Sequence, residues 1–205
     1  MPRLFALALV LAGSTGCDSS DRPGGTGGSG GGEAGTLSVQ AYLYTAEGAG
    51  YTLLEPGAEL ELWAAPQGGH WARIGARVGG LGTDTAELVG RLFDPTTDAL
   101  IVEADRTAPM VTTKDDPSLK QPDPLDMYNV VHLPLCPGEG GRGLDGESYR
   151  LEVQVTELYG NFSTGSVSLP VVPSCQQPAG PAQDYCACEC GSDYLPGKCG
   201  GPTNG

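Results

Sequence analysis

The sequence has little positive charge. Its 205 residues include 11 Lys and Arg against 25 Asp and Glu, which gives a formal net charge of −14 at pH 7. Nucleic acids are bound through clustered Lys and Arg, so this balance argues against a nucleic-acid partner. It argues equally against adsorption to an anionic lipid surface. We favour a solvated, repulsive surface, with an acidic calcium-binding surface as the alternative.

Residues and motifs that commonly act in catalysis are also scarce. The chain has two histidines, and it contains no Gly-x-Ser-x-Gly and no His-Glu-x-x-His motif. We expect His132 to be a partly buried sheet residue, and His70, which follows a Gly-Gly turn, to be an ordinary surface residue. We therefore predict no catalytic residue and no cofactor. The abundant carboxylates leave a glycosidase-like acid pair open.

No apolar run is long enough to span a membrane permanently. The run near the N-terminus, Leu4 to Leu11, is shorter than the ~20 residues that a spanning helix needs. Arg3 precedes it and the small residues 12–16 follow it, which is the order of regions in a secretory signal. We therefore expect the chain to be exported.

The end of this signal, Thr15-Gly16-Cys17, resembles the end of a bacterial lipoprotein signal, in which a small residue precedes the acylated cysteine. Ser14 departs from the pattern, because the family usually has an aliphatic residue there. The resemblance covers the first 17 residues. It implies that residues 1–16 are removed, that Cys17 receives a diacylglycerol, and that the protein is anchored to the cell envelope, at the outer membrane or the cell surface. Cleavage after Ser14, with Cys17 as a spare thiol, is the alternative.

Two further features favour acylation of Cys17. Seven cysteines are an awkward number for an exported chain, and setting Cys17 aside leaves six that can all pair. The residues behind it are dominated by Gly and Ser. We therefore interpret residues 17–36 as the lipidated cysteine and a flexible tether, with an r.m.s. span of about 25 Å.

Residues 37–175 form the main domain. Its apolar residues recur at every second position and are interrupted by Gly, Pro and Asp, a pattern typical of short strands. We predict an all-β fold, an antiparallel β-sandwich of about eight strands, with strands near residues 37–45 and 128–134.

Three hairpins of this domain can be aligned by matching their apolar faces. The most regular one pairs residues 149–156 with residues 164–171 and places Tyr149 opposite Val171. The other two give these opposite pairs: Leu88 with Ala104, Gly90 with Val102, Leu92 with Leu100, Leu60 with Ile74, and Leu62 with Ala72.

Residues 149–172 resemble the terminal hairpin of an immunoglobulin-like or fibronectin-like bacterial module, whose turn has the form Val-Thr-Asp-x-x-Gly-Asn-x-Ser. Here that turn runs from Val155 to Ser163. The segment from Asp105 to Pro109 is similar to an Asp-x-Thr-Ala-Pro motif near the edges of such modules. The resemblance implies an immunoglobulin-like sandwich, a fold that by itself implies no chemistry.

The Pro- and Asp-rich residues 106–127 are long for a connection. We expect them to be either disordered or a functional loop. Their acidic residues match no EF-hand spacing: Asp115, Asp116, Asp123 and Asp126.

Residues 176–205 form a Cys-rich tail. An exported protein meets an oxidising environment, so we predict three disulfides and no metal among six cysteines: Cys136, Cys175, Cys186, Cys188, Cys190 and Cys199. We expect a Cys136–Cys175 bridge, because both residues follow strand ends. An extended segment would place the thiolates of Cys186, Cys188 and Cys190 on one side, so a soft-metal site stays open.

The third hairpin places Trp63 opposite Trp71, and Glu61 opposite Arg73, on the polar face. Two exposed indoles side by side form a flat aromatic surface for sugar rings or apolar peptide groups. Such pairs also stabilise sheets without binding anything. If the main domain binds a ligand, we predict Trp63 and Trp71 as its anchors.

These features predict a membrane-tethered, non-catalytic binding or structural module of the bacterial cell envelope. Its partners would be the membrane, through the lipid anchor, and envelope polysaccharide or protein. One alternative is an enzyme, or an enzyme's accessory domain, that acts on envelope polymers. A concave site in which carboxylates or His132 converge would favour it. The other alternative is a metal-binding tail on an inert domain.

Overall fold

A computed structural model of the protein describes residues 35–45, 50–138 and 143–199. The predicted signal, Cys17 and nearly all of the tether lie outside these residues. The described part contains these elements: β1 (Ser38–Thr45), β2 (Gly50–Leu53), β3 (Ala58–Glu61), β4 (Trp63–Ala64), β5 (His70–Gly79), β6 (Thr85–Phe93), β7 (Leu100–Thr112), β8 (Leu119–Pro122), the 3₁₀ helix η1 (Met127–Asn129), β9 (Val131–Cys136), β10 (Tyr149–Glu157), β11 (Thr164–Ser174) and α1 (Pro181–Cys190). Neither described helix has the length and apolar character needed to cross a membrane.

The strands form one mixed sheet. Its order is β2-β1-β5-β8-β7-β6-β10-β11-β3, with β4 and β9 also paired to β5. The all-β prediction is correct for the strands, but the expectation of an antiparallel-only fold is wrong, because β3 runs parallel to β11. The described residues also hold eleven strands rather than about eight.

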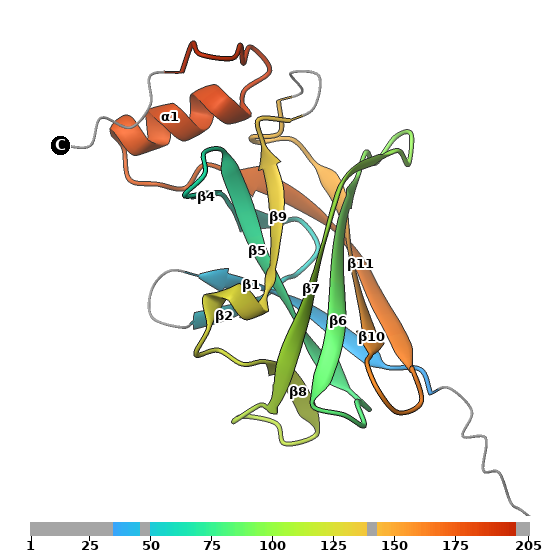
Figure 1. The fold of residues 1–205 in the computed structure, drawn as a ribbon. Coiled ribbons are helices and arrows are strands. Elements are labelled where there is room, and N and C mark those ends of the chain that lie inside the picture. Colours follow the sequence, from blue (N-terminus) through green and yellow to red (C-terminus); the bar gives the residue numbers. More distant parts are fainter. Residues whose placement is uncertain (1–34, 46–49, 139–142, 200–205) are drawn as a thin grey trace, which may run out of the picture. The chain divides into compact units, whose positions relative to one another are not determined.

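β7 lies between two ladders of the sheet, one with β6, β10 and β11 and the other with β8, β5 and β1 (Figure 1). Buried apolar residues of both ladders belong to one core. Residues up to Pro109 pair with β6, and Met110 begins the pairing with β8. Gly90 of β6 shows how closely the ladders approach, since a Cβ there would lie 3.2 Å from Val131 of β9. Both ladders supply fully buried residues to the core, among them Ile74, Leu88, Leu133 and Leu151.

The predicted register of the β10–β11 hairpin is confirmed. Every pair from Tyr149–Val171 to Thr156–Thr164 is present. Burial alternates strictly along β10, and Arg150, Glu152, Gln154 and Thr156 lie on its outer face. There Arg91 of β6 donates hydrogen bonds to Glu152 and Gln154.

The predicted register of β6 and β7 is wrong by two residues. A bulge between Leu92 and Phe93 leaves an extra residue on β7. A shift of two residues keeps every side chain on its predicted face, so the hydrophobic pattern could not detect it. The observed partners of Leu88, Gly90 and Leu92 are Arg106, Ala104 and Val102.

Residues 106–127 are not a long loop. Their first part continues β7 and their middle forms β8, joined by a turn in which the Thr113 hydroxyl donates to the Asp116 carbonyl at 2.6 Å. Pro109 lies at the point where β7 changes partner strand, a position in which a missing N–H is tolerated. The proline therefore marks a change of pairing, not the end of the strand.

The third predicted hairpin is correct only near its turn. Trp63 pairs with Trp71 and Ala64 with His70. Leu60 instead pairs with Pro173, and the Leu62 amide donates to a carbonyl of β11. The chain thus passes from one ladder to the other at Leu62, which a two-strand alignment does not allow for.

Candidate functional site

The two tryptophans lie opposite each other, and both are partly exposed. Each already has a stacking partner. The guanidinium carbon of Arg73 lies 4.0 Å from the ring centre of Trp63 and 5.0 Å from that of Tyr44. The ring centre of Trp71 lies 4.3 Å from that of His132. The indoles therefore do not form a bare aromatic surface.

Arg73 is buried, with 4% of its surface exposed, so the expected exposed Glu61–Arg73 pair is wrong. Burial lowers the pKa of Arg73, while Tyr44 and Glu61 act in the opposite direction. Aromatic rings on a guanidinium stabilise its charge where water is excluded. Among the described residues, Nε and Nη2 of Arg73 have no hydrogen-bond partner.

A pocket of about 300 Å³ lies beside Trp63, at the lower end of the range for small-ligand sites. Its walls come from the end of β3, from β4, from the start of β5, from the residues after β11 and from the first half of α1. It is lined by Glu61, Trp63, Ala64, His70, Gln176, Gln177, Pro178, Ala182 and Tyr185. Of the two predicted anchors, the pocket includes Trp63 and not Trp71.

Two lining side chains carry buried polar atoms that have no partner among the described residues. One is the indole N–H of Trp63, a donor, and the other is Oε1 of Gln177, an acceptor. The amide nitrogen of Gln177 donates to the carbonyl of Leu62, which fixes the orientation of this side chain. Unpaired buried groups are rare in folded proteins, and a bound group or water commonly accounts for them.

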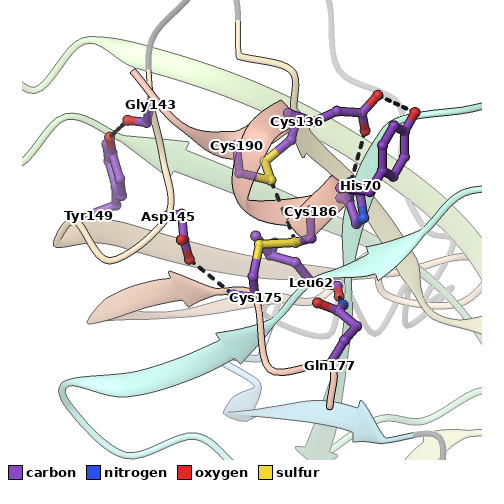
Figure 2. Close-up of a disulfide and its surroundings, with 12 residues drawn as sticks. Leu62, His70, Cys136, Gly143, Asp145, Tyr149, Cys175, Gln177, Cys186 and Cys190 are labelled. Carbon is purple, nitrogen blue, oxygen red and sulfur yellow. Dashed lines mark hydrogen bonds and ion pairs between the residues drawn. A yellow bond between two sulfur atoms is a disulfide. The ribbon is translucent and has the colours of Figure 1, made fainter. Parts of the chain in front are cut away.

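His70 is buried, with 2% of its surface exposed, so its predicted surface position is wrong. Helix α1 covers the start of β5 and brings Glu189 to it, with Nδ1 of His70 3.0 Å from Oε2 (Figure 2). Burial lowers the pKa of His70, an effect that Glu189 partly opposes. The Tyr185 hydroxyl donates to the other Glu189 oxygen at 2.5 Å, and this bond raises the pKa of Tyr185 to about 12.

His132 matches its prediction as a partly buried sheet residue. It lies in β9, and its Nε2 is 3.0 Å from the carbonyl oxygen of Met127. Burial lowers the pKa of His132. It does not line the pocket beside Trp63.

The six described cysteines form three disulfides, as predicted: Cys136–Cys190, Cys175–Cys186 and Cys188–Cys199. The expected Cys136–Cys175 bridge is wrong, and so is the extended segment assumed for the tail. Residues 181–190 are helical, so Cys186 and Cys190 lie one turn apart on the same face. Each of them therefore bonds to one strand end.

Helix α1 has almost no apolar face of its own. It begins with Pro181 after Gly180, a favourable helix start, and the residues it buries are Cys186, Glu189 and Cys190. Two cystines and the bond to His70 thus hold it over the sheet (Figure 2). One wall of the pocket depends on these links.

Gln177, Tyr185 and Glu189 were not among the site residues predicted from the sequence. The helix start at Pro181 and the four-residue spacing from Tyr185 to Glu189 were the available signals. Nothing local indicated that this helix covers His70, more than 100 residues earlier. Comparisons with protein families, with curated proteins and with solved structures gave no match.

Proposed function

We propose that the protein is an exported, lipid-anchored and non-catalytic binding module of the bacterial cell envelope, with the pocket beside Trp63 as its ligand site. The pocket carries this proposal, because it combines an indole ring with unpaired buried polar atoms. Three disulfides suit an oxidising compartment outside the cytoplasm. Two facing ladders suit an immunoglobulin-like scaffold, a common carrier of binding surfaces.

The chemistry of the pocket favours an uncharged polar ligand. An unpaired donor on Trp63 and an unpaired acceptor on Gln177 suit a hydroxyl or amide group, which both donates and accepts. The indole supplies apolar contact area of the kind that sugar rings use. We therefore propose the sugar units of an envelope polysaccharide as the ligand class.

Binding of the soluble chain to peptidoglycan and to cell-surface polysaccharide tests this proposal. We expect Trp63→Ala to weaken binding roughly tenfold to a hundredfold, because a buried aromatic contact contributes ~1.5–3 kcal/mol. Gln177→Ala should weaken binding while leaving the Trp63–Arg73 stack intact. The matched control is Tyr159→Ala, which removes a 72% exposed aromatic residue on the β10–β11 turn. Wild-type binding by folded Trp63→Ala and Gln177→Ala variants would refute the proposal.

One observation favours an enzyme instead. Glu61 and His70 line the same pocket, so a carboxylate and an imidazole are close to any ligand there. The same polymers should then release fragments on incubation with the protein, and Glu61→Gln should stop the release. Fragment release that depends on Glu61 would show that the protein is an enzyme and would contradict the proposed non-catalytic role. Binding without release supports it.

A further inference from the structure

Two disulfides meet beside His70 beneath α1 (Figure 2). The Sγ atoms of Cys186 and Cys190 lie 3.9 Å apart, although they belong to different bridges. Together with a ring nitrogen of His70, these sulfurs lie within 4.8 Å of one another, and all three residues are buried.

This spacing is close to that of ligands on one metal ion. Zinc binds thiolate sulfur at about 2.3 Å in tetrahedral geometry, which places two such sulfurs ~3.8 Å apart. Histidine nitrogen binds at a slightly shorter distance. Once their bridges open, Cys186 and Cys190 need to move little to share an ion with His70.

The surroundings of His70 also match those of a metal ligand. A histidine that binds metal through one ring nitrogen usually donates its other N–H to a carboxylate. Nδ1 of His70 lies 3.0 Å from the carboxylate of Glu189, which the Tyr185 hydroxyl in turn orients. A hydrogen bond to this carboxylate favours the tautomer with the proton on Nδ1, in which Nε2 carries the lone pair that can bind a metal ion.

We propose that reduction of the Cys136–Cys190 and Cys175–Cys186 bridges creates a buried site for Zn²⁺ or a similar thiophilic divalent cation. Its ligands are Cys186, Cys190 and His70, and either Cys136 or Cys175 supplies the fourth. Each of these two is bonded to a cysteine of the cluster before reduction, Cys136 to Cys190 and Cys175 to Cys186. The inference does not depend on the pocket ligand.

The chemistry balances with a dithiol as the reductant. Each disulfide takes up two electrons and two protons and gives two thiols, while one dithiol becomes a disulfide. Two dithiols therefore open both bridges. The cation then displaces the thiol protons, because zinc binds thiolates. In this state the metal ion, in place of the cystines, links α1 to the sheet.

The test uses the full chain with Cys17→Ser, reduced by excess water-soluble phosphine in the presence of Zn²⁺, or of Co²⁺ as a spectroscopic probe. We expect one ion per chain, a thiolate-to-cobalt charge-transfer band, and a higher unfolding temperature with metal than without. A second variant, Glu189→Gln, keeps all six thiols. It should bind the ion about 10- to 100-fold more weakly, the usual effect of removing such a histidine partner.

The matched control is Cys188→Ser with Cys199→Ser, which removes the one bridge outside the cluster. It should bind one ion with unchanged affinity. Three results would overturn the proposal: no ion bound after reduction, equal affinity in the Glu189→Gln variant and the parent chain, or loss of binding in the control. Equal affinity would show that loose thiols, and not the folded cluster, hold the metal.

Discussion

At the scale of single residues, Gly75 pairs with Tyr42 in the β1–β5 ladder and leaves no room for a side chain. A Cβ on residue 75 would lie 2.2 Å from Cζ of Tyr42, a fully buried ring on the side of β1 away from the main core. We expect Gly75→Ala to lower the free energy of unfolding by about 1–3 kcal/mol, because the ring or the strand must shift. Urea unfolding measures this.

A double-mutant cycle shows whether the Tyr42 ring is the cause. In a Tyr42→Leu background, Gly75→Ala should cost clearly less, since the smaller side chain leaves room for a Cβ. The same cost in both backgrounds would contradict this explanation.

The two histidines predict how stability depends on pH. Burial lowers the pKa of both His70 and His132 below the ordinary value of 6.5. Between 6.5 and the lowered folded pKa, the unfolded chain binds more protons than the folded chain, so stability rises with pH. The contribution is fully present above pH 6.5 and declines as the pH falls through 6.5 toward the folded pKa.

Urea unfolding from pH 7.5 to 5.5 tests this pH dependence. The free energy of unfolding should fall on acidification, and His70→Gln should flatten the slope by removing one of the two titrating groups. A wild-type stability that increases as the pH drops through this window would show that Glu189 outweighs burial at His70.

The sequence predicted the Trp63–Trp71 pair, because alternating strands fix which residues lie opposite each other. It did not predict the burial of Arg73 or His70. A polar side chain is buried together with partners such as Tyr44 and Glu189, and these come from distant segments. The polarity of such a residue therefore predicts an exposed side chain, whereas its contacts with distant residues bury it.

At the scale of secondary structure elements, regular alternation predicted the register only where two strands pair without interruption. The β10–β11 hairpin does so over its whole length and was predicted correctly. The β6–β7 alignment failed because of the bulge between Leu92 and Phe93, and the third hairpin failed because the chain changes ladder at Leu62. Helix α1 was missed because it has no apolar stripe and depends on cystines for its position.

Helix α1 leads to a prediction about the bridges. Removing Cys136–Cys190, which closes a separation of 54 residues, with Cys136→Ala and Cys190→Ala should cost ~4 kcal/mol of unfolding free energy. It should also increase amide hydrogen exchange along α1, since the helix loses one of its two anchors on the strands. Hydrogen exchange read by mass spectrometry resolves this region.

The comparison variant is Cys188→Ala with Cys199→Ala. This bridge closes a separation of 11 residues between the helix and its own C-terminal extension, so we expect a cost of up to ~3 kcal/mol and unchanged exchange along the buried face of α1. Equal exchange in the two variants would mean that apolar packing, and not the cystines, holds the helix.

At the scale of the whole molecule, the disulfide pairing bears on the one cysteine outside the described residues. Cys136, Cys175, Cys186, Cys188, Cys190 and Cys199 pair among themselves. No described cysteine is then left as a partner for Cys17. An exported chain seldom carries a lone free thiol, so the pairing adds weight to acylation as the role of Cys17.

We therefore predict that the mature protein begins at Cys17 and carries a diacylglycerol there. Intact-mass measurement of protein extracted from membranes should give the mass of the chain from Cys17 onward, less six hydrogen atoms for three disulfides, plus the lipid. Cys17→Ser should move the protein to the soluble fraction while its unfolding temperature stays the same, because the three disulfides and the core that stabilise the fold lie within residues 35–199. Acyl chains bind membranes by burying CH₂ groups, so a variant without them loses this affinity. An unmodified Cys17 in membrane-extracted protein, or a mature chain that begins at Thr15, would contradict the lipoprotein interpretation and leave the disulfide-bonded domain as an ordinary secreted protein.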